Sequence, residues 1–136
     1  MLLRKTFRFE ASHILPKHPG KCARLHGHSW VLHVFVEGFV DKETGFVMDF
    51  AEISSTVKPL IDKLDHRHLG TIEFDYKQDW LVEGMRWDFY PSSENLLHWI
   101  GEQLSGMVWS KLALEETCTS YAELTRLEYD QNAIRS

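Results

Sequence analysis

The sequence has few cysteines, no long apolar run and no cluster of basic residues. Its two cysteines, Cys22 and Cys118, could pair in principle, but a structural disulfide is disfavoured in a cytosolic chain. No apolar run approaches the roughly 18–20 residues that a membrane span needs. The net charge is -5 without a block of lysine or arginine, which argues against duplex nucleic acid as a partner.

The remaining composition is that of an ordinary globular protein. Apolar residues make up 43% and charged residues 26% of 136 residues, which suits one domain over residues 1–136 with its own core. The stretch Met1–Lys5 lacks the apolar centre of a signal peptide. We therefore expect a cytoplasmic protein without a membrane segment.

The N-terminal part of the chain carries the alternation typical of β-strands. Over residues 7–13, apolar side chains and a histidine alternate with polar ones, which predicts a half-buried strand. A second strand is predicted over residues 25–37, and because both of its faces are largely apolar we expect cover on both sides. Residues 41–45 indicate a hairpin turn, and residues 46–48 a short third strand.

Two helices are predicted from their caps and apolar stripes. Asp49 is suited to cap a helix over residues 50–64, whose apolar side chains recur on one stripe. Pro59 inside this helix predicts a kink or a break. Ser92 starts a second amphipathic helix, which Ser105-Gly106 ends.

The other segments complete the predicted architecture. Residues 70–90 are interpreted as a long ordered loop with short strand pieces, and residues 111–119 and 121–129 as a final pair of strands. This order of elements predicts an α+β fold in which helices cover one face of an antiparallel sheet.

The triplet His26-Gly27-His28 is the sharpest local signal. Residues two apart in a strand point to the same side, so both imidazoles can converge on one ion, and His13 at the end of the neighbouring strand offers a third nitrogen. Three neutral imidazoles suit Zn2+ and leave a fourth position for water or substrate, as in catalytic zinc sites. The competing interpretation is that each is a packed or surface residue, as a single strand histidine more often is.

Three further groups have both a chemical and a structural interpretation. Cys22 lies four residues before His26, where a nearby cation would favour its thiolate, but it could equally be a buried inert thiol or a fourth zinc ligand. Asp65 can orient His66 for proton transfer, although adjacent residues do not always face each other. Glu116 belongs to a pair of adjacent acidic residues, and such a pair ordinarily lies in solvent. Alternatively, its carboxylate could accept two parallel N–H hydrogen bonds from the guanidine-like edge of a ring.

Six motifs spanning residues 7–119 resemble, in this order, those of the 6-pyruvoyl-tetrahydropterin synthase family. Each is weak alone, but the series is specific. The gap of three residues between Cys22 and His26 is most similar to the family's 6-carboxytetrahydropterin synthase branch, which serves queuosine biosynthesis. The matching stretches are Phe9-Glu10-Ala11-Ser12-His13, Cys22-Ala23-Arg24-Leu25-His26-Gly27-His28, Gly45-Phe46-Val47-Met48-Asp49-Phe50, Leu64-Asp65-His66, Pro91-Ser92-Ser93-Glu94-Asn95 and Glu116-Thr117-Cys118-Thr119.

The resemblance implies a role for each candidate residue. The substrate it implies is 7,8-dihydroneopterin triphosphate, and the implied products are 6-carboxy-5,6,7,8-tetrahydropterin, acetaldehyde and triphosphate. Candidates for holding the triphosphate, by position and charge alone, are Lys21, Arg24 and Arg67. The implied zinc ligands are His13, His26 and His28. The implied catalytic groups are Cys22, Asp65 and His66. The implied anchor for the pterin ring is Glu116.

The resemblance also implies the tunnelling fold, or T-fold. In this fold the antiparallel sheets of several subunits join edge to edge into a barrel, usually as a trimer paired into a homohexamer with active sites between subunits. Such an assembly would cover sheet edges that a lone chain leaves open. Two stretches depart from the family pattern: the connection over residues 70–90, which is longer than usual, and the charged tail after Thr119.

Three rival functions fit parts of the same pattern. A pyruvoyl-tetrahydropterin synthase of biopterin synthesis would use the same zinc and thiol but form a different product. A non-catalytic pterin-binding or zinc-binding subunit would need the metal at most. A zinc hydrolase would use metal-bound hydroxide at the open position.

Overall fold

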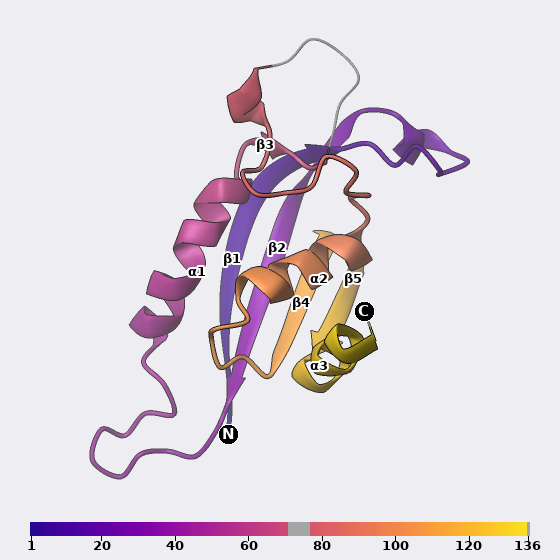
Figure 1. Ribbon diagram of the computed structural model, residues 1–136. Helices are drawn as coiled ribbons and strands as arrows, with labels where there is room; N and C mark the ends of the chain where they lie inside the picture. Colours follow the sequence, from indigo (N-terminus) through magenta and orange to yellow (C-terminus); the bar gives the residue numbers. More distant parts are fainter. Residues whose placement is uncertain (71–76, 136) are drawn as a thin grey trace.

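The computed structural model describes residues 1–70 and 77–135, which form a sheet with helices packed on it (Figure 1). The strand order in this part of the chain is β3-β1-β2-β4-β5. None of its helices is long and apolar enough to cross a bilayer. The strands are β1 (Leu2–His13), β2 (His26–Glu37), β3 (Arg67–His68), β4 (Lys111–Thr117) and β5 (Ser120–Thr125). The helices are α1 (Phe50–Leu64), α2 (Ser93–Gln103) and α3 (Arg126–Arg135), with 3-10 turns at Lys21–Ala23 and Gln78–Trp80.

The sheet confirms the two N-terminal strands and the α+β fold class. β1 and β2 pair antiparallel along their whole length, from Leu2 opposite Glu37 to His13 opposite His26. β2–β4 and β4–β5 are also antiparallel, whereas the two-residue β3 runs parallel to β1 at the sheet edge. The predicted alternation holds, because the apolar positions of residues 7–13 are buried on one face and the polar ones are not.

The helix α1 begins and packs as predicted. The carboxylate of Asp49 accepts a hydrogen bond of 2.8 Å from the Ala51 amide and so caps the first turn. The predicted stripe faces the sheet, and its buried members are Ile53, Val57, Leu60, Ile61 and Leu64. The possible break at Pro59 does not occur, because Pro59 and Ser55 lie on the exposed side, where water can satisfy the carbonyl that loses its amide partner.

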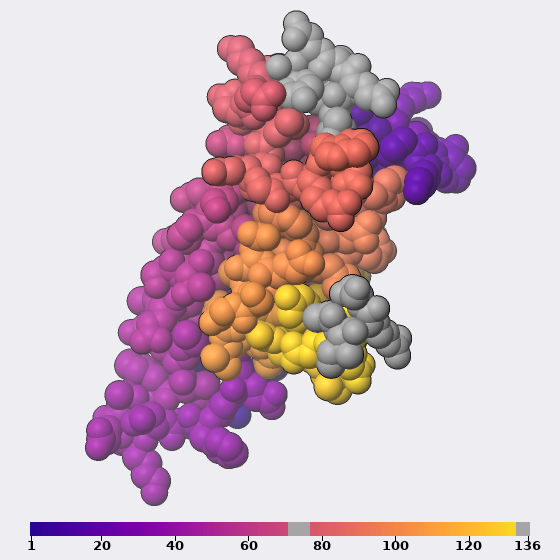
Figure 2. Space-filling view, viewed as in Figure 1, coloured from indigo at the N-terminus to yellow at the C-terminus, as the bar shows by residue number. Residues whose placement is uncertain are grey.

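The core lies between the sheet and the helices α1 and α2, while α3 packs beside β5 (Figure 1). Its largest side chains include Trp30 and Trp109, both almost fully buried. Each indole N–H donates to a carbonyl at 3.1 Å, that of Ala11 and that of Leu104 respectively. Both buried indole N–H groups therefore have a hydrogen-bond partner. Figure 2 shows the helical layer closing over the core, with the connection between β2 and α1 projecting from one end.

No helix covers the opposite face of the sheet within the described chain (Figure 1), although Val31 and Ala113 on this face are buried among their neighbours. The prediction that β2 is covered on both sides is therefore not met by this chain alone. Polar groups from three strands meet on this face. The His33 ring lies 2.8 Å from the Thr6 hydroxyl and 2.6 Å from a carboxylate oxygen of Glu115.

The prediction of a third strand over residues 46–48 is wrong. Asp41 accepts hydrogen bonds from the Glu43 and Thr44 amides, which forms the predicted turn. After that turn only one backbone hydrogen bond returns, from the Asp41 amide to the Phe46 carbonyl. Val47 and Met48 instead pack their side chains against the core. Hydrophobic burial, not strand pairing, explains the apolar character of this stretch.

The predicted final strands end earlier than expected, and a helix was missed. β4 ends at Thr117 and β5 at Thr125, so the strand predicted over residues 121–129 is half helix. The Thr125 hydroxyl accepts from the Glu128 amide at 3.2 Å and donates to the Glu128 carboxylate at 2.9 Å. This Thr-x-x-Glu pattern is a helix-starting signal in the sequence.

The connection over residues 70–90 falls partly outside the described residues, at 71–76. The described remainder holds the 3-10 turn Gln78–Trp80 and a single parallel bridge between Leu81 and His68. The short strand piece that was predicted is thus one bridge that extends the sheet edge beyond β3.

Core packing generates the first prediction. Leu32 is fully buried at the centre of the sheet, so Leu32→Ala is expected to lower the free energy of unfolding by about 2–5 kcal/mol. Val108→Ala is the matched control, because Val108 is 74% exposed, and it should stay within about 0.5 kcal/mol of the parent. Urea unfolding at one fixed protein concentration measures both, and equal losses in the two variants would contradict this account of the core.

Candidate metal centre and its surroundings

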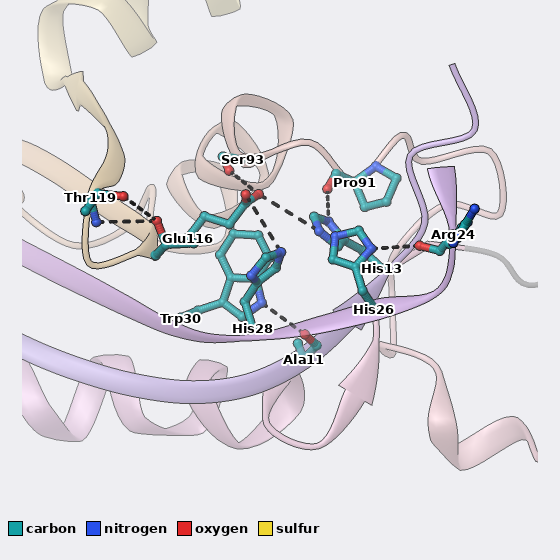
Figure 3. Close-up of polar contacts among 11 residues, drawn as sticks. Ala11, His13, Arg24, His26, His28, Trp30, Pro91, Ser93, Glu116 and Thr119 are labelled. Atoms are coloured by element: carbon teal, nitrogen blue, oxygen red, sulfur yellow. Dashed lines mark hydrogen bonds and ion pairs between the residues drawn. The ribbon is translucent and has the colours of Figure 1, made fainter. Parts of the chain in front are cut away.

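The three predicted histidines converge at one end of the sheet (Figure 3). His13 is the last residue of β1, and the register places it opposite His26, with Ala11 opposite His28. The ring centroids are 4.5, 5.1 and 4.9 Å apart for the pairs 13–26, 13–28 and 26–28. One nitrogen from each ring lies within 4.8 Å of the other two. The three nitrogens are therefore close enough together to hold one metal ion after a small inward adjustment of the rings.

Backbone carbonyls fix the orientation of two of the rings. Nδ1 of His13 lies 2.7 Å from the Pro91 carbonyl oxygen, and Nδ1 of His26 lies 2.7 Å from that of Arg24. A carbonyl only accepts, so both Nδ1 atoms carry the hydrogen and both Nε2 atoms present a lone pair. Metal-binding histidines are commonly oriented in this way.

The Nε2 atoms of all three histidines are buried and have no hydrogen-bond partner. Buried polar atoms are rarely left without a partner, and a cation bound between them would satisfy all three at once. Burial lowers the pKa of both His13 and His28 below the ordinary value of 6.5. Neutral imidazoles at physiological pH are the form that binds zinc, so the donor set fits this ion.

Trp30 forms the floor of the cluster and links it to the core. Its ring lies 5.2 Å from the His13 ring and 5.3 Å from the His28 ring, nearly perpendicular to both. On its other side it stacks on Phe9 at 6.1 Å. The side chains of the centre are thus held against rigid aromatic groups.

Glu116 lies beside the histidines, near the end of β4. Its carboxylate oxygens are 3.7 Å from Nε2 of His28 and 3.9 Å from Nε2 of His13. The Ser93 hydroxyl, at the start of α2, donates to one of these oxygens at 3.0 Å. Glu116 and His28 also border a cavity of about 500 Å³, most of whose lining, including Arg8, Ser29 and Val31, belongs to the opposite face of the sheet.

Asp65 and His66 form the predicted pair. Asp65 Oδ2 lies 3.0 Å from Nδ1 of His66, and Asp65 Oδ1 accepts from the Glu10 amide at 2.8 Å. His66 adopts a φ of 59°, a left-handed conformation rare for residues other than glycine, which lets the two adjacent side chains meet. The Glu10 amide, with the His66 imidazole as a further cause, lowers the pKa of Asp65.

This pair does not touch the histidine cluster of its own chain. His66 lines a cavity of about 670 Å³ together with Ser12 and Trp80. Ser12 alternates with His13 along β1, so this cavity opens on the face away from the cluster, although the strand segment that carries His26 and His28 borders it. The His66 side chain is 76% exposed.

Cys22 lies in the loop that joins the two metal-binding strands. It belongs to the 3-10 turn Lys21–Ala23, is partly buried and is a free thiol. The Leu15 amide donates to the Cys22 carbonyl at 2.9 Å, which closes the loop at its base. Within the described residues its thiol makes no hydrogen bond, and the structure does not bring it into contact with the Asp65–His66 pair.

Sequence reasoning missed several supporting residues. Ser93 and the Pro91 carbonyl belong to a stretch that the sequence marks as a helix start and as one of the six family-like motifs, without a role in the site for either group. His68, which is 5% exposed and whose Nδ1 lies 2.8 Å from the Ser12 hydroxyl, was not considered. Nothing in the local pattern marks these partners, because the contacts join residues that are 23, 56 and 78 positions apart in the sequence.

Three imidazoles at a sheet end, with a carboxylate beside them and helices on one face, define an α+β protein with a histidine cluster that could hold a metal ion. Comparison with known families is more specific. The chain matches the 6-pyruvoyl tetrahydropterin synthase family over residues 2–127, and it belongs to that family.

Individual relatives agree with this assignment. The 6-carboxy-5,6,7,8-tetrahydropterin synthase of Synechocystis sp. is 37% identical over 131 residues, which cover 89% of this chain and 90% of the relative. The dihydroneopterin monophosphate aldolase of Pyrococcus furiosus is 35% identical over 80 residues, 59% of this chain and 55% of the relative. The structure of Caenorhabditis elegans 6-pyruvoyl tetrahydropterin synthase matches with a TM-score of 0.75 at 24% identity, covering 92% of this chain and 94% of that one. This last likeness confirms the fold class.

The geometry predicts zinc binding. The purified protein is expected to bind about one zinc ion per chain, and His13→Ala, His26→Ala and His28→Ala should each lose most of it. His33→Ala is the matched control, because His33 lies on the open face and pairs with Glu115. Elemental analysis after dialysis measures the metal content. Full zinc content in the three variants would overturn the assignment.

The Asp65 pair predicts a pH effect. Hydrogen bonding holds the pKa of Asp65 below its ordinary value of 3.8, so its contribution to stability is complete above that pH and is lost as the pH falls through the lower, folded-state pKa. Asp65→Asn should therefore lower stability most above pH 3.8, and the difference from the parent should shrink in stronger acid. Urea unfolding as a function of pH tests this, and a difference that grows in acid would contradict it.

Proposed function

We propose that the protein is a zinc-dependent 6-carboxy-5,6,7,8-tetrahydropterin synthase, a lyase of queuosine biosynthesis. It would convert 7,8-dihydroneopterin triphosphate to 6-carboxytetrahydropterin, acetaldehyde and triphosphate. The observation that carries the proposal is the set of three buried imidazole nitrogens without a partner. The Synechocystis relative, which aligns over nine-tenths of both chains, supports the choice of reaction.

His13, His26 and His28 would hold the zinc ion, which supplies a positive charge that polarises oxygen atoms of the substrate side chain. The protein contributes the orientation of these ligands through the Pro91 and Arg24 carbonyls. The rigid floor keeps the three nitrogens in place without reorganisation. The centre is therefore prepared before the substrate arrives.

Glu116 would recognise the pterin ring. A carboxylate matches the two parallel N–H groups of a guanidine-like edge, and such charge-assisted pairs are strong and directional. The support for this role is the place of the carboxylate, whose oxygens lie 3.7 Å from Nε2 of His28 and 3.9 Å from Nε2 of His13. The ring would thus be held close to the metal, with its side chain directed at the histidines.

Cys22 and the Asp65–His66 pair would move the protons. The Cys22 thiolate would take a proton from the substrate side chain, and His66, oriented by Asp65, would deliver or remove the others. Lys21, Arg24 and Arg67 are the candidates for holding the triphosphate.

The location of the Asp65–His66 pair supports an active site shared between subunits. The pair lies at an exposed sheet edge, and within the described residues no hydrogen bond or ion pair joins it to the three imidazoles of its own chain. In a homohexamer formed from two trimers, one subunit would supply this pair to the metal centre of another. The open face and edges of the sheet would be covered in the same assembly.

A pyruvoyl-tetrahydropterin synthase is the second candidate. Membership of the family is equally compatible with this activity and with the carboxy-forming one. It would use the same metal and thiol. The two functions differ in product, because only the carboxy-forming reaction releases acetaldehyde. The Pyrococcus relative makes dihydroneopterin monophosphate a useful second substrate to test.

Product analysis tests the proposal. With 7,8-dihydroneopterin triphosphate, the zinc-loaded protein should form 6-carboxytetrahydropterin and acetaldehyde, and a chelator should abolish turnover. Accumulation of 6-pyruvoyltetrahydropterin without acetaldehyde would assign the second candidate instead. If the zinc-loaded oligomer converts neither dihydroneopterin triphosphate nor dihydroneopterin monophosphate, the remaining interpretation is a non-catalytic binding subunit.

The Cys22 variant separates chemistry from metal binding. Cys22→Ala should reduce turnover by at least about 100-fold, as expected when a group that transfers protons in the reaction is lost, while zinc content stays unchanged. Cys118→Ala, which removes the other thiol, is the control and should retain turnover. Persistent turnover in Cys22→Ala with zinc bound would exclude a chemical role for this thiol.

A further inference from the structure

We propose that Glu116 is the fourth zinc ligand when no pterin is bound, and that it leaves the metal to bind the pterin ring. The inference rests on the metal centre proposed above. In the free protein, Glu116 would occupy the fourth coordination position of the metal, which the substrate needs when it binds.

The distances place the carboxylate near the fourth corner of a tetrahedron. A zinc ion bound at about 2.0–2.1 Å from three nitrogens has neighbouring ligand atoms about 3.3–3.5 Å apart. The Glu116 oxygens lie 3.7 Å from Nε2 of His28 and 3.9 Å from Nε2 of His13. The contact of Oε1 with His28 and that of Oε2 with His13 are each within about 0.6 Å of this ligand spacing.

The surroundings direct the carboxylate to this position. The Ser93 hydroxyl donates to Oε2 of Glu116 at 3.0 Å, from the opposite side to the histidines (Figure 3). Among residues 1–70 and 77–135, Glu116 is the one acid that forms an ion-pair contact with the cluster. Ligating carboxylates are typically hydrogen-bonded by a second group in this manner. The arrangement therefore has both the ligand and the group that orients it.

The same carboxylate cannot serve two partners fully. When it coordinates zinc, it has fewer oxygens free for the ring N–H groups, and when it accepts both of these N–H groups, it vacates a position on the metal. Binding of the ring would thereby open the metal to the side-chain oxygens of the correct ligand. By thermodynamic reciprocity, the interaction that tightens zinc in the free protein must weaken pterin binding by the same factor.

Zinc affinity of the metal-free protein tests the first state. Competition with a chromophoric chelator should show that Glu116→Gln binds zinc between about 10- and 100-fold more weakly than the parent. Glu115→Gln is the matched control: it removes the same charge one residue away, on the open face, where Glu115 contacts His33. It should leave the affinity unchanged. Circular dichroism and the melting temperature of each metal-free variant show whether folding is preserved.

Cobalt spectra test the geometry directly. With Co2+ in place of zinc, the parent and Glu115→Gln should give the same visible absorption bands, and Glu116→Gln should give different ones. Addition of neopterin should change the spectrum of the parent, as the carboxylate leaves the metal.

The outcomes separate this inference from the proposed function. Equal zinc affinity and equal cobalt spectra in the parent and Glu116→Gln would overturn the fourth-ligand assignment while leaving the three-histidine centre intact. A spectrum of the parent that neopterin does not alter would overturn the exchange between metal and ring. Failure of the parent protein to bind any metal would remove the proposed function itself.

Discussion

The antiparallel register between β1 and β2 is the constraint on which the site depends. It places His13 opposite His26 and Ala11 opposite His28, so that three imidazoles project to the covered face of the sheet. A slip by one residue would turn His26 and His28 to the open face and expose the apolar side chains of β2. The burial of Trp30, Leu32 and Val34 on the same face opposes that slip. The hydrophobic core thus specifies the geometry of a polar site.

Much of the fold could be predicted from local patterns. Alternation identified β1 and β2, and Asp49 and Ser92 marked the starts of the two main helices, both of which use these side chains as caps. The two errors have different causes. Residues 46–48 are apolar because they pack on the core, not because they pair with a strand. The Thr125–Glu128 capping pair was present in the sequence but was overlooked within a charged stretch that resembles an edge strand.

The site was predictable only in part. The three histidines follow from strand alternation alone, and the Asp65–His66 pair is local. The contacts of Glu116 with Ser93 and with two histidines depend on how β4, α2 and β2 pack together. No local pattern reports such long-range packing. The separation of Asp65–His66 from the cluster is a property of the tertiary fold for the same reason.

Trp30 belongs to the core and to the metal site at once. Its indole N–H is bound to the Ala11 carbonyl, and its ring meets two of the imidazoles edge to face. One of the protein's five tryptophans is therefore an intrinsic fluorophore at the base of the proposed metal site. A paramagnetic ion between the histidines would quench its emission at short range. Binding of such an ion at the centre can thus be followed by tryptophan fluorescence in the unlabelled protein. Because the same indole also packs in the core, a substitution of Trp30 would disturb both the sheet and the centre.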